Sequence, residues 1–218
     1  MKMDKEYWIL YYNSKLSEER APSHFAQYII DQFLNTIRHS DGHRPRLIEL
    51  GCGDGRDSIY FSNNNIEVIA VDQVSDVIES LKSENRNKDS ICFRCDDFTS
   101  LNTQEMFDIV YSRFTMHSIN SREQDRVLDW AYGHLSKNGL FCIEARGKNN
   151  ELFKQGEKVE SEDDAYIHDH HYRRFIDVKE LCNQLLECGF SVIYSAEKEG
   201  FAPYKGTNET YFRVIAKR

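Results

Sequence analysis

The segment around residue 51 constrains the fold of this chain more than any other. A strand-like run at residues 46–50 leads into glycines at positions 51, 53 and 55, and apolar residues at helical spacing follow. Glycine has no Cβ, so glycines at this spacing let the backbone turn tightly and let a ligand approach it closely. The order of strand, glycine-rich turn and helix predicts the first βα unit of a parallel sheet.

Further β-rich runs alternate with helical segments along the chain, as expected of βαβ units. The other strands of this alternation are predicted at residues 67–71, 91–95, 107–112 and 140–145, and the helices at 54–63, 74–83, 123–135 and 178–188. Two late strands, 191–196 and 210–216, have no helix between them and are predicted to pair as an antiparallel hairpin. We therefore predict an α/β fold with a single doubly wound, mostly parallel seven-stranded sheet and an antiparallel last strand.

Two segments lie outside this alternation. Residues 1–45 combine aromatic residues at helical spacing with an amphipathic stretch, which predicts a helical N-terminal lid. Residues 147–174 form a polar connection that is long for a compact domain, and such connections are often functional. The length of 218 residues favours one domain over 1–218, with 147–174 as an insertion for acceptor binding.

The composition argues against several partners and compartments. The formal net charge is −8 without a basic tail, so a nucleic-acid partner is not expected. No apolar run of about 18 residues and no secretory signal is present, so we expect no membrane span and a cytoplasmic location. The six cysteines are scattered through apolar stretches, which is typical of reduced thiols. The pair Cys92 and Cys95 has no second pair at zinc spacing, which leaves a metal or redox site there as the less favoured alternative.

Charged residues stand at defined distances from the glycine turn. Asp72 ends the second predicted strand about 20 residues later, where a carboxylate bridges the two hydroxyls of a ribose. This position serves nicotinamide dinucleotides and adenosylmethionine alike. A dinucleotide fingerprint places its third glycine at position 56, where this chain has Arg56. The spacing is instead G-x-G-x-G, with Glu49 two residues before the first glycine.

The stretch from Glu49 to Asp57 resembles motif I of the class I, or Rossmann-like, S-adenosylmethionine-dependent methyltransferases. Residues 95–98 resemble the adenine-binding turn of that family, 107–112 its fourth strand, and 211–216 its antiparallel last strand. The resemblance covers residues 45–146 well and the remainder loosely. It implies S-adenosylmethionine as the cofactor. Taken with the spacing, it assigns contacts with this cofactor to Tyr12, Glu49, Gly51, Cys52, Gly53, Arg56, Asp72, Gln73, Asp97, Phe98 and Ser112.

Several of these roles stay open between two interpretations. Glu49 either orients the glycine turn, which we favour, or faces the sulfonium. Arg56 either pairs with the methionine carboxylate at the N-terminus of a helix or is a solvated helix residue. Asp97 is expected to accept the exocyclic amine of adenine, whereas Asp108, at the amino end of its strand, is expected to be structural.

The N-terminal aromatic residues also have two interpretations. Trp8, Tyr11 and Tyr12 either cover the cofactor and face the sulfonium through cation–π attraction, or fix their helix to the core. In the first interpretation Tyr12 is the preferred contact. Ser23 and Phe25 are expected to anchor this lid.

The best candidate for a catalytic residue is His117. It follows the fourth predicted strand, whose carboxyl end opens toward the ligand edge of the sheet. A histidine that is neutral near pH 7 can take a proton from an acceptor hydroxyl. The alternative is a packed histidine that is hydrogen-bonded to the backbone.

The end of the insertion concentrates imidazole and guanidinium groups. His170, His171, Arg173 and Arg174 are expected to bind an acceptor anion, because arginine matches phosphate and carboxylate geometry. His168 and Asp169 add possible metal ligands, but adjacent residues rarely all face one ion, so we expect no metal. In its arrangement this region resembles methyltransferases of bacterial surface-polysaccharide pathways.

These observations predict an S-adenosylmethionine-dependent O-methyltransferase. Its acceptor is expected to be small or glycan-linked and to carry a phosphate or a carboxylate. Two alternatives stay open: a nicotinamide-dependent oxidoreductase, which Arg56 disfavours, and a non-catalytic partner subunit that binds adenosylmethionine. The oligomeric state cannot be predicted from the sequence.

Overall fold

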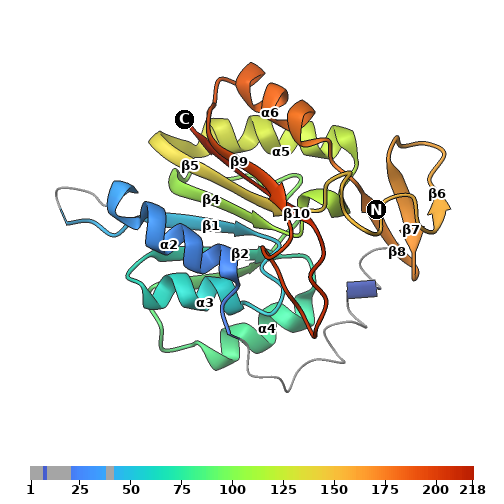
Figure 1. The fold of residues 1–218 in the computed structure, drawn as a ribbon. Helices are drawn as coiled ribbons and strands as arrows, with labels where there is room; N and C mark the ends of the chain where they lie inside the picture. The colour runs from blue at the N-terminus through green and yellow to red at the C-terminus, as the bar shows by residue number, and fades with distance from the viewer. Residues whose placement is uncertain (1–6, 9–20, 38–41) are drawn as a thin grey trace.

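The computed structural model describes residues 7–8, 21–37 and 42–218. Its centre is a seven-stranded sheet in the order β3-β2-β1-β4-β5-β10-β9 (Figure 1). The strands are β1 (Arg46–Leu50), β2 (Glu67–Asp72), β3 (Ile91–Cys95), β4 (Phe107–Arg113), β5 (Leu135–Ala145), β9 (Ser191–Lys198) and β10 (Tyr211–Lys217). β10 runs antiparallel to both of its neighbours. This topology confirms the predicted sheet and the predicted antiparallel pairing of the late strands.

Helices cover both faces of the sheet (Figure 1). One face carries α2 (His24–Ile37), α3 (Arg56–Asn63) and α4 (Ser75–Glu84), and the other carries α5 (Ser121–His134) and α6 (Val178–Glu187). A capping box begins α5, in which Asn120 accepts from the Glu123 amide and Glu123 accepts from the Asn120 amide, each at 2.9 Å. Asp177 caps α6 by accepting hydrogen bonds from the Lys179 and Glu180 amides. No helix in the described part of the chain is long and apolar enough to cross a membrane.

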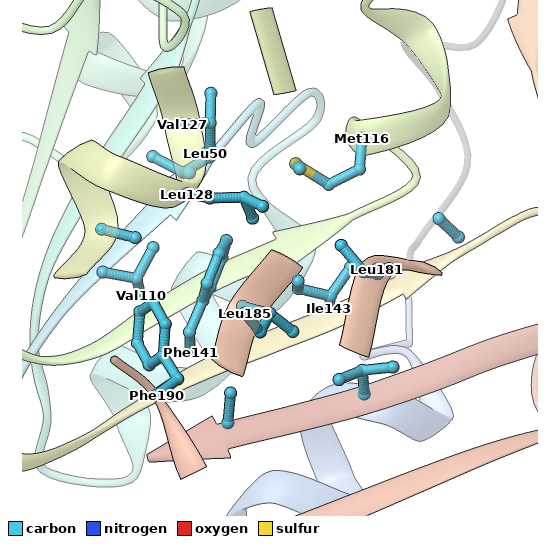
Figure 2. Close-up of a cluster of buried hydrophobic side chains, with 14 of the residues drawn as sticks. Leu50, Val110, Met116, Val127, Leu128, Phe141, Ile143, Leu181, Leu185 and Phe190 are labelled. Atoms are coloured by element: carbon cyan, nitrogen blue, oxygen red, sulfur yellow. The ribbon is translucent and has the colours of Figure 1, made fainter. Parts of the chain in front are cut away.

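Two hydrophobic clusters fill the space between the sheet and its helices. Figure 2 shows the cluster under α5 and α6, where Leu128 and Leu185 meet Val110 and Phe141 of the sheet. Strand residues alternate between the two faces. As a result, neighbouring β5 residues such as Phe141 and Cys142 enter different clusters. The sheet is thereby buried on both faces, which leaves its carboxyl edge for ligands.

The insertion is more ordered than its polar sequence suggests. It contains a small antiparallel sheet of β6 (Glu157–Lys158), β7 (Ala165–His168) and β8 (His171–Arg174). The residues that join β7 to β8, Asp169 and His170, both have positive φ values of 51° and 59°. A hairpin loop of two such residues usually contains glycine, so the sequence lacks the usual signal for it. β8 packs against the short helix η1 (Met116–Ser118), which follows β4 at the carboxyl edge of the main sheet.

Candidate functional site

The glycine turn after β1 is a tight cradle at the carboxyl edge of the sheet. Gly51, Gly53 and Gly55 have positive φ values of 75°, 51° and 73°. A Cβ on Gly51 would lie 2.3 Å from Thr115 Cγ2, so no larger residue fits there. The Gly51 and Cys52 amides both donate to the Val71 carbonyl, at 2.9 and 2.8 Å. The turn therefore brings bare backbone to the place where a ligand of this fold binds.

Asp72 lies beside this turn at the end of β2. Its carboxylate accepts hydrogen bonds from the Gly53 amide at 2.9 Å and the Val74 amide at 3.0 Å. Burial raises the pKa of Asp72, although these two amides oppose the shift. A buried carboxylate that is already oriented by the turn fits the ribose role expected of it.

The other predicted cofactor residues surround the turn. Cys52 and Ser112 are buried, and Gln73 directly follows Asp72. A Phe98 ring carbon lies 3.8 Å from the position of a Cβ on Gly51, so this ring borders the turn. Asp97 is exposed and accepts from the amide and hydroxyl of Thr99, at 2.9 and 2.8 Å. These positions suit a nucleoside site. Two further predicted residues, Tyr11 and Tyr12, lie outside the described residues.

Glu49 points into the protein beneath α3. It is 4% exposed and accepts a hydrogen bond from the Ser58 hydroxyl. Burial and the nearby Asp57 raise the pKa of Glu49 well above its ordinary value. This geometry favours the interpretation in which Glu49 orients the turn, because Ser58 belongs to the helix that the turn begins. Arg56 is part-exposed, with its Nε 4.0 Å from Asp57 Oδ1.

A buried cluster around Asp57, which includes the expected anchors Ser23 and Phe25, fixes the start of α2. Asp57 accepts from the Ser23 amide and hydroxyl, both at 2.7 Å, and from the Tyr111 hydroxyl at 2.9 Å. Ser23 also accepts from the Ala26 amide at 3.0 Å, and the Phe25 ring stacks on Tyr111. Ser23 and Phe25 thus tie α2 to α3 and β4.

His117 lies in η1 and is 4% exposed. Its Nδ1 accepts a hydrogen bond from the Arg146 amide at 3.3 Å. Burial lowers the pKa of His117 well below 6.5, and the charges of Arg146, His171, Arg173 and Arg174 lower it further. A neutral ring that accepts at Nδ1 carries its proton on Nε2, where it is a donor. The geometry therefore favours the packed-histidine interpretation over that of a general base.

We predict that the depressed pKa of His117 makes stability depend on pH. Below about pH 6.5 the unfolded state takes up a proton that the folded state refuses, so stability falls as pH falls. The unfolding free energy of the wild type, minus that of His117→Gln, should drop by up to about 1.4 kcal/mol per pH unit below this value. Urea unfolding of both proteins at several pH values between about 8 and 5 measures it.

The difference between the two proteins cancels the opposite contribution of Glu49, whose raised pKa makes folding more favourable as pH falls. A difference that does not change with pH would show that His117 titrates alike in the folded and unfolded states.

The two arginines of β8 have different surroundings. Arg174 is 8% exposed and donates to the Ile119 carbonyl at 3.1 Å and to Gln124 Oε1 at 2.5 Å. Arg173 is half-buried and donates to the His168 carbonyl at 3.0 Å. Among the described residues, no carboxylate lies within 4 Å of the Arg173 guanidinium. Arg174 differs, because its Nε lies 3.8 Å from Glu162 Oε1. Burial and the nearby Arg146 lower the pKa of Arg173.

The two histidines of the hairpin, His170 and His171, also differ in burial. His171 is buried, with the Tyr7 ring stacked on it at 4.3 Å and the Trp8 ring edge-on at 5.0 Å. His170 is exposed in the hairpin turn. The charges of His171, Arg173 and Arg174 all act on His117. Arg174 makes its hydrogen bonds inside the protein, and His170 lies at the tip of the hairpin. Trp8 contacts the insertion and also packs against the cluster under α2.

No group of three or more His, Cys, Asp or Glu side chains within the described ranges is placed to hold a metal ion. His168 Nδ1 lies 3.2 Å from Asp169 Oδ2, which makes these two residues an ion pair when the histidine is protonated. Cys92 and Cys95 are exposed free cysteines on β3.

The sequence matches the family described as "Methyltransferase domain" over residues 23–195. It is 27% identical over 135 residues to the malonyl-[acyl-carrier protein] O-methyltransferase of Bacillus cytotoxicus, and the match covers 60% of this chain and 46% of that one. A protein of the same name from Bacillus anthracis is 28% identical over 113 residues, which are 51% of this chain and 41% of that one. The chain thus spans less than half the length of these two relatives.

Solved structures share this fold. The 1,6-didemethyltoxoflavin-N1-methyltransferase of Burkholderia thailandensis, solved with its acceptor and S-adenosylhomocysteine, superimposes with a TM-score of 0.74 at 18% identity, covering 100% of this chain and 88% of that one. A SAM-dependent methyltransferase of Methanosarcina mazei superimposes with a TM-score of 0.71 at 16% identity, covering 86% of this chain and 97% of that one. Both likenesses confirm the fold.

Proposed function

Because this chain belongs to the family of S-adenosylmethionine-dependent methyltransferase domains, we propose that it methylates an oxygen of a small acceptor whose anion binds at Arg173. Family membership argues against the oxidoreductase that the sequence left open, and methyl transfer in the assay described below would exclude the non-catalytic subunit. The cradle at Gly51, which a Cβ would fill, and the buried carboxylate of Asp72 fit the cofactor. When bound, S-adenosylmethionine supplies an activated methyl group on its sulfonium.

The observation that carries the acceptor proposal is the state of Arg173. Its guanidinium is half-buried, donates one hydrogen bond to a carbonyl, and has no carboxylate within 4 Å among the described residues. Burial and Arg146 both disfavour its charge, as the lowered pKa of Arg173 indicates. An acceptor anion would offset this cost, because charged hydrogen bonds to guanidinium are strong. An acidic protein repels anions at long range, so such a site suits a short-range contact.

The state of His117 favours a carboxylate as the oxygen that is methylated. A carboxylate is already deprotonated at pH 7 and needs no base, whereas a hydroxyl does. His117 Nδ1 is occupied by the Arg146 amide, so its Nε2–H is the group left to donate to an acceptor oxygen. The name of the Bacillus relatives, which describes O-methylation of a malonyl group, supports the same chemistry. A phosphate oxygen is the second candidate, and the glycan-linked acceptor stays a prediction.

This proposal predicts that the methylated product is an ester. We would incubate the protein with methyl-labelled S-adenosylmethionine and a panel of aliphatic carboxylates, malonyl thioesters, phosphate monoesters and neutral alcohols. A carboxyl methyl ester releases its label as methanol in mild alkali, whereas a methyl ether does not. We expect a compound with a free carboxylate, such as a malonyl thioester, to acquire label that alkali releases. The same malonyl thioester with its carboxylate already esterified should acquire no label. A neutral alcohol that is the best acceptor, with label stable to alkali, would contradict the proposal.

A further inference from the structure

We infer that Phe114 is a positioning residue of the acceptor site, held in a left-handed backbone conformation so that its ring, stacked on Tyr211, fixes the side chain of Arg146 beside His117. This inference rests on the proposed function, because it concerns the same acceptor anion. Phe114 directly follows β4 and was not among the residues that the sequence singled out.

The backbone of Phe114 is unusual for a bulky residue. Its φ is 61°, in the region where a side chain clashes with its own backbone and glycine or asparagine is normally found. Contacts on both sides hold it there: the Phe114 amide donates to the Glu144 carbonyl at 2.8 Å, and the hydroxyls of Ser112 and Thr115 lie 2.5 Å apart. Strained residues of this kind cluster at functional sites.

This turn sends consecutive side chains to different parts of the site. The Thr115 methyl lies against the glycine turn, 2.3 Å from the position of a Cβ on Gly51. The Phe114 ring instead stacks on Tyr211, with the ring centroids 4.8 Å apart. Phe114 therefore lies at the junction between the cofactor turn and the residues around His117.

The Phe114 ring is part of a cation–aromatic column formed by Arg113, Phe114, Tyr211 and Arg146. The Arg113 guanidinium lies 4.0 Å from the Phe114 ring centroid, and that of Arg146 lies 4.9 Å from the Tyr211 centroid. Arg146 is ion-paired with Glu209, which also accepts from the Tyr211 hydroxyl at 2.9 Å. The Arg146 amide in turn holds His117. The column thus fixes Arg146, whose charge acts on both His117 and Arg173.

Packing into the core does not explain the ring. Phe114 is only half-buried and, as far as the described residues show, belongs to neither hydrophobic cluster. Glycine would adopt this backbone at lower cost. The contacts of the ring with the column therefore explain why phenylalanine, and not glycine, stands at this position.

Two substitutions separate the strain from the ring. Phe114→Gly and Phe114→Ala both remove the ring, but only glycine relieves the positive φ. We would saturate each variant with S-adenosylhomocysteine and titrate malonate and inorganic phosphate, as probes of the two anion classes, by calorimetry. Both variants should bind the preferred anion at least about 10-fold more weakly than the wild type and S-adenosylhomocysteine within about threefold. The glycine variant should melt about 2–4 °C above the alanine variant. Phe114→Tyr, which keeps the ring, should bind the anion normally.

The outcomes distinguish this inference from the proposed function. If Arg173→Ala abolishes anion binding but Phe114→Gly binds like the wild type, the inference about Phe114 is wrong and the proposed function stands. The same conclusion follows if anion affinity only tracks melting temperature, so that alanine loses binding and glycine keeps it. If neither anion binds the wild type, or Arg173→Ala binds both unchanged, the proposed acceptor site fails and the inference fails with it.

Discussion

Asp72→Ala should bind S-adenosylmethionine about 10- to 1000-fold more weakly than the wild type. One or two charged hydrogen bonds between the carboxylate and the ribose would be lost, at about 1.5–4 kcal/mol in total. The same substitution removes the acceptor of the Gly53 and Val74 amides and so loosens the turn that faces the cofactor. Titration calorimetry with S-adenosylmethionine and with S-adenosylhomocysteine measures the change.

The matched control for this experiment is Asp76→Ala. Asp76 is an exposed acid in the first turn of α4, so its removal changes the net charge equally without touching the glycine turn. We expect its affinity for the cofactor to stay within about twofold of the wild type. A folded Asp72→Ala protein with unchanged affinity would exclude Asp72 from the ribose role.

Arg173→Ala should raise the KM for the acceptor by at least about tenfold, or about 1.4 kcal/mol, and leave cofactor affinity nearly unchanged. The reason is that Arg173 lacks a carboxylate partner among the described residues, so its removal takes away a ligand contact and little internal structure. Steady-state kinetics with the acceptor identified from the panel, together with cofactor titration, measures both quantities.

Arg174→Ala supplies the opposite pattern as a control. It removes a buried donor from the Ile119 carbonyl and Gln124, which should cost about 1–3 kcal/mol of stability and lower the melting temperature by several degrees. We expect its acceptor KM to change less than that of Arg173→Ala. If Arg173→Ala turns over the acceptor normally, the anion binds elsewhere and the proposed role of the insertion is wrong.

The framework of the fold could be predicted because its signals are local. The strand before Gly51 and the glycine spacing follow from patterns within a few residues, and Asp72 follows from its place at the end of the next predicted strand. The late antiparallel strands were also predictable, since no helix separates them. The structure confirmed the sheet, and it placed the predicted residues of the glycine turn together.

The details of the acceptor side depend on contacts that no local pattern encodes. Arg173 and Arg174 were predicted to act together, but adjacent strand residues point to opposite faces, and the polar insertion did not read as a strand. The hairpin turn at Asp169 and His170 lacks the usual glycine. The bond between His117 and the Arg146 amide joins residues 29 positions apart, so the tautomer could not be predicted.

Some of the buried polar residues that support the site were also missed. Glu144 is fully buried and pairs with Arg113 at 2.8 Å and Arg213 at 2.6 Å, three residues from three different strands. A buried charge is costly without partners, so charged residues inside predicted strands are the signal that could have found this network. Asp57 carried a similar signal, because it is an acid at the start of a helix and its partners are Ser23, which directly precedes α2, and Tyr111 of β4.

The central claim is that the cofactor and an acceptor anion bind side by side at the carboxyl edge of the main sheet. A crystal structure of the protein with S-adenosylhomocysteine and the acceptor found in the panel tests it most directly. We predict that the ribose hydroxyls contact Asp72, that the sulfur faces the acceptor oxygen, and that the acceptor anion contacts the Arg173 guanidinium. An acceptor anion bound away from Arg173, or a nucleoside bound away from the Gly51 turn, would contradict the account.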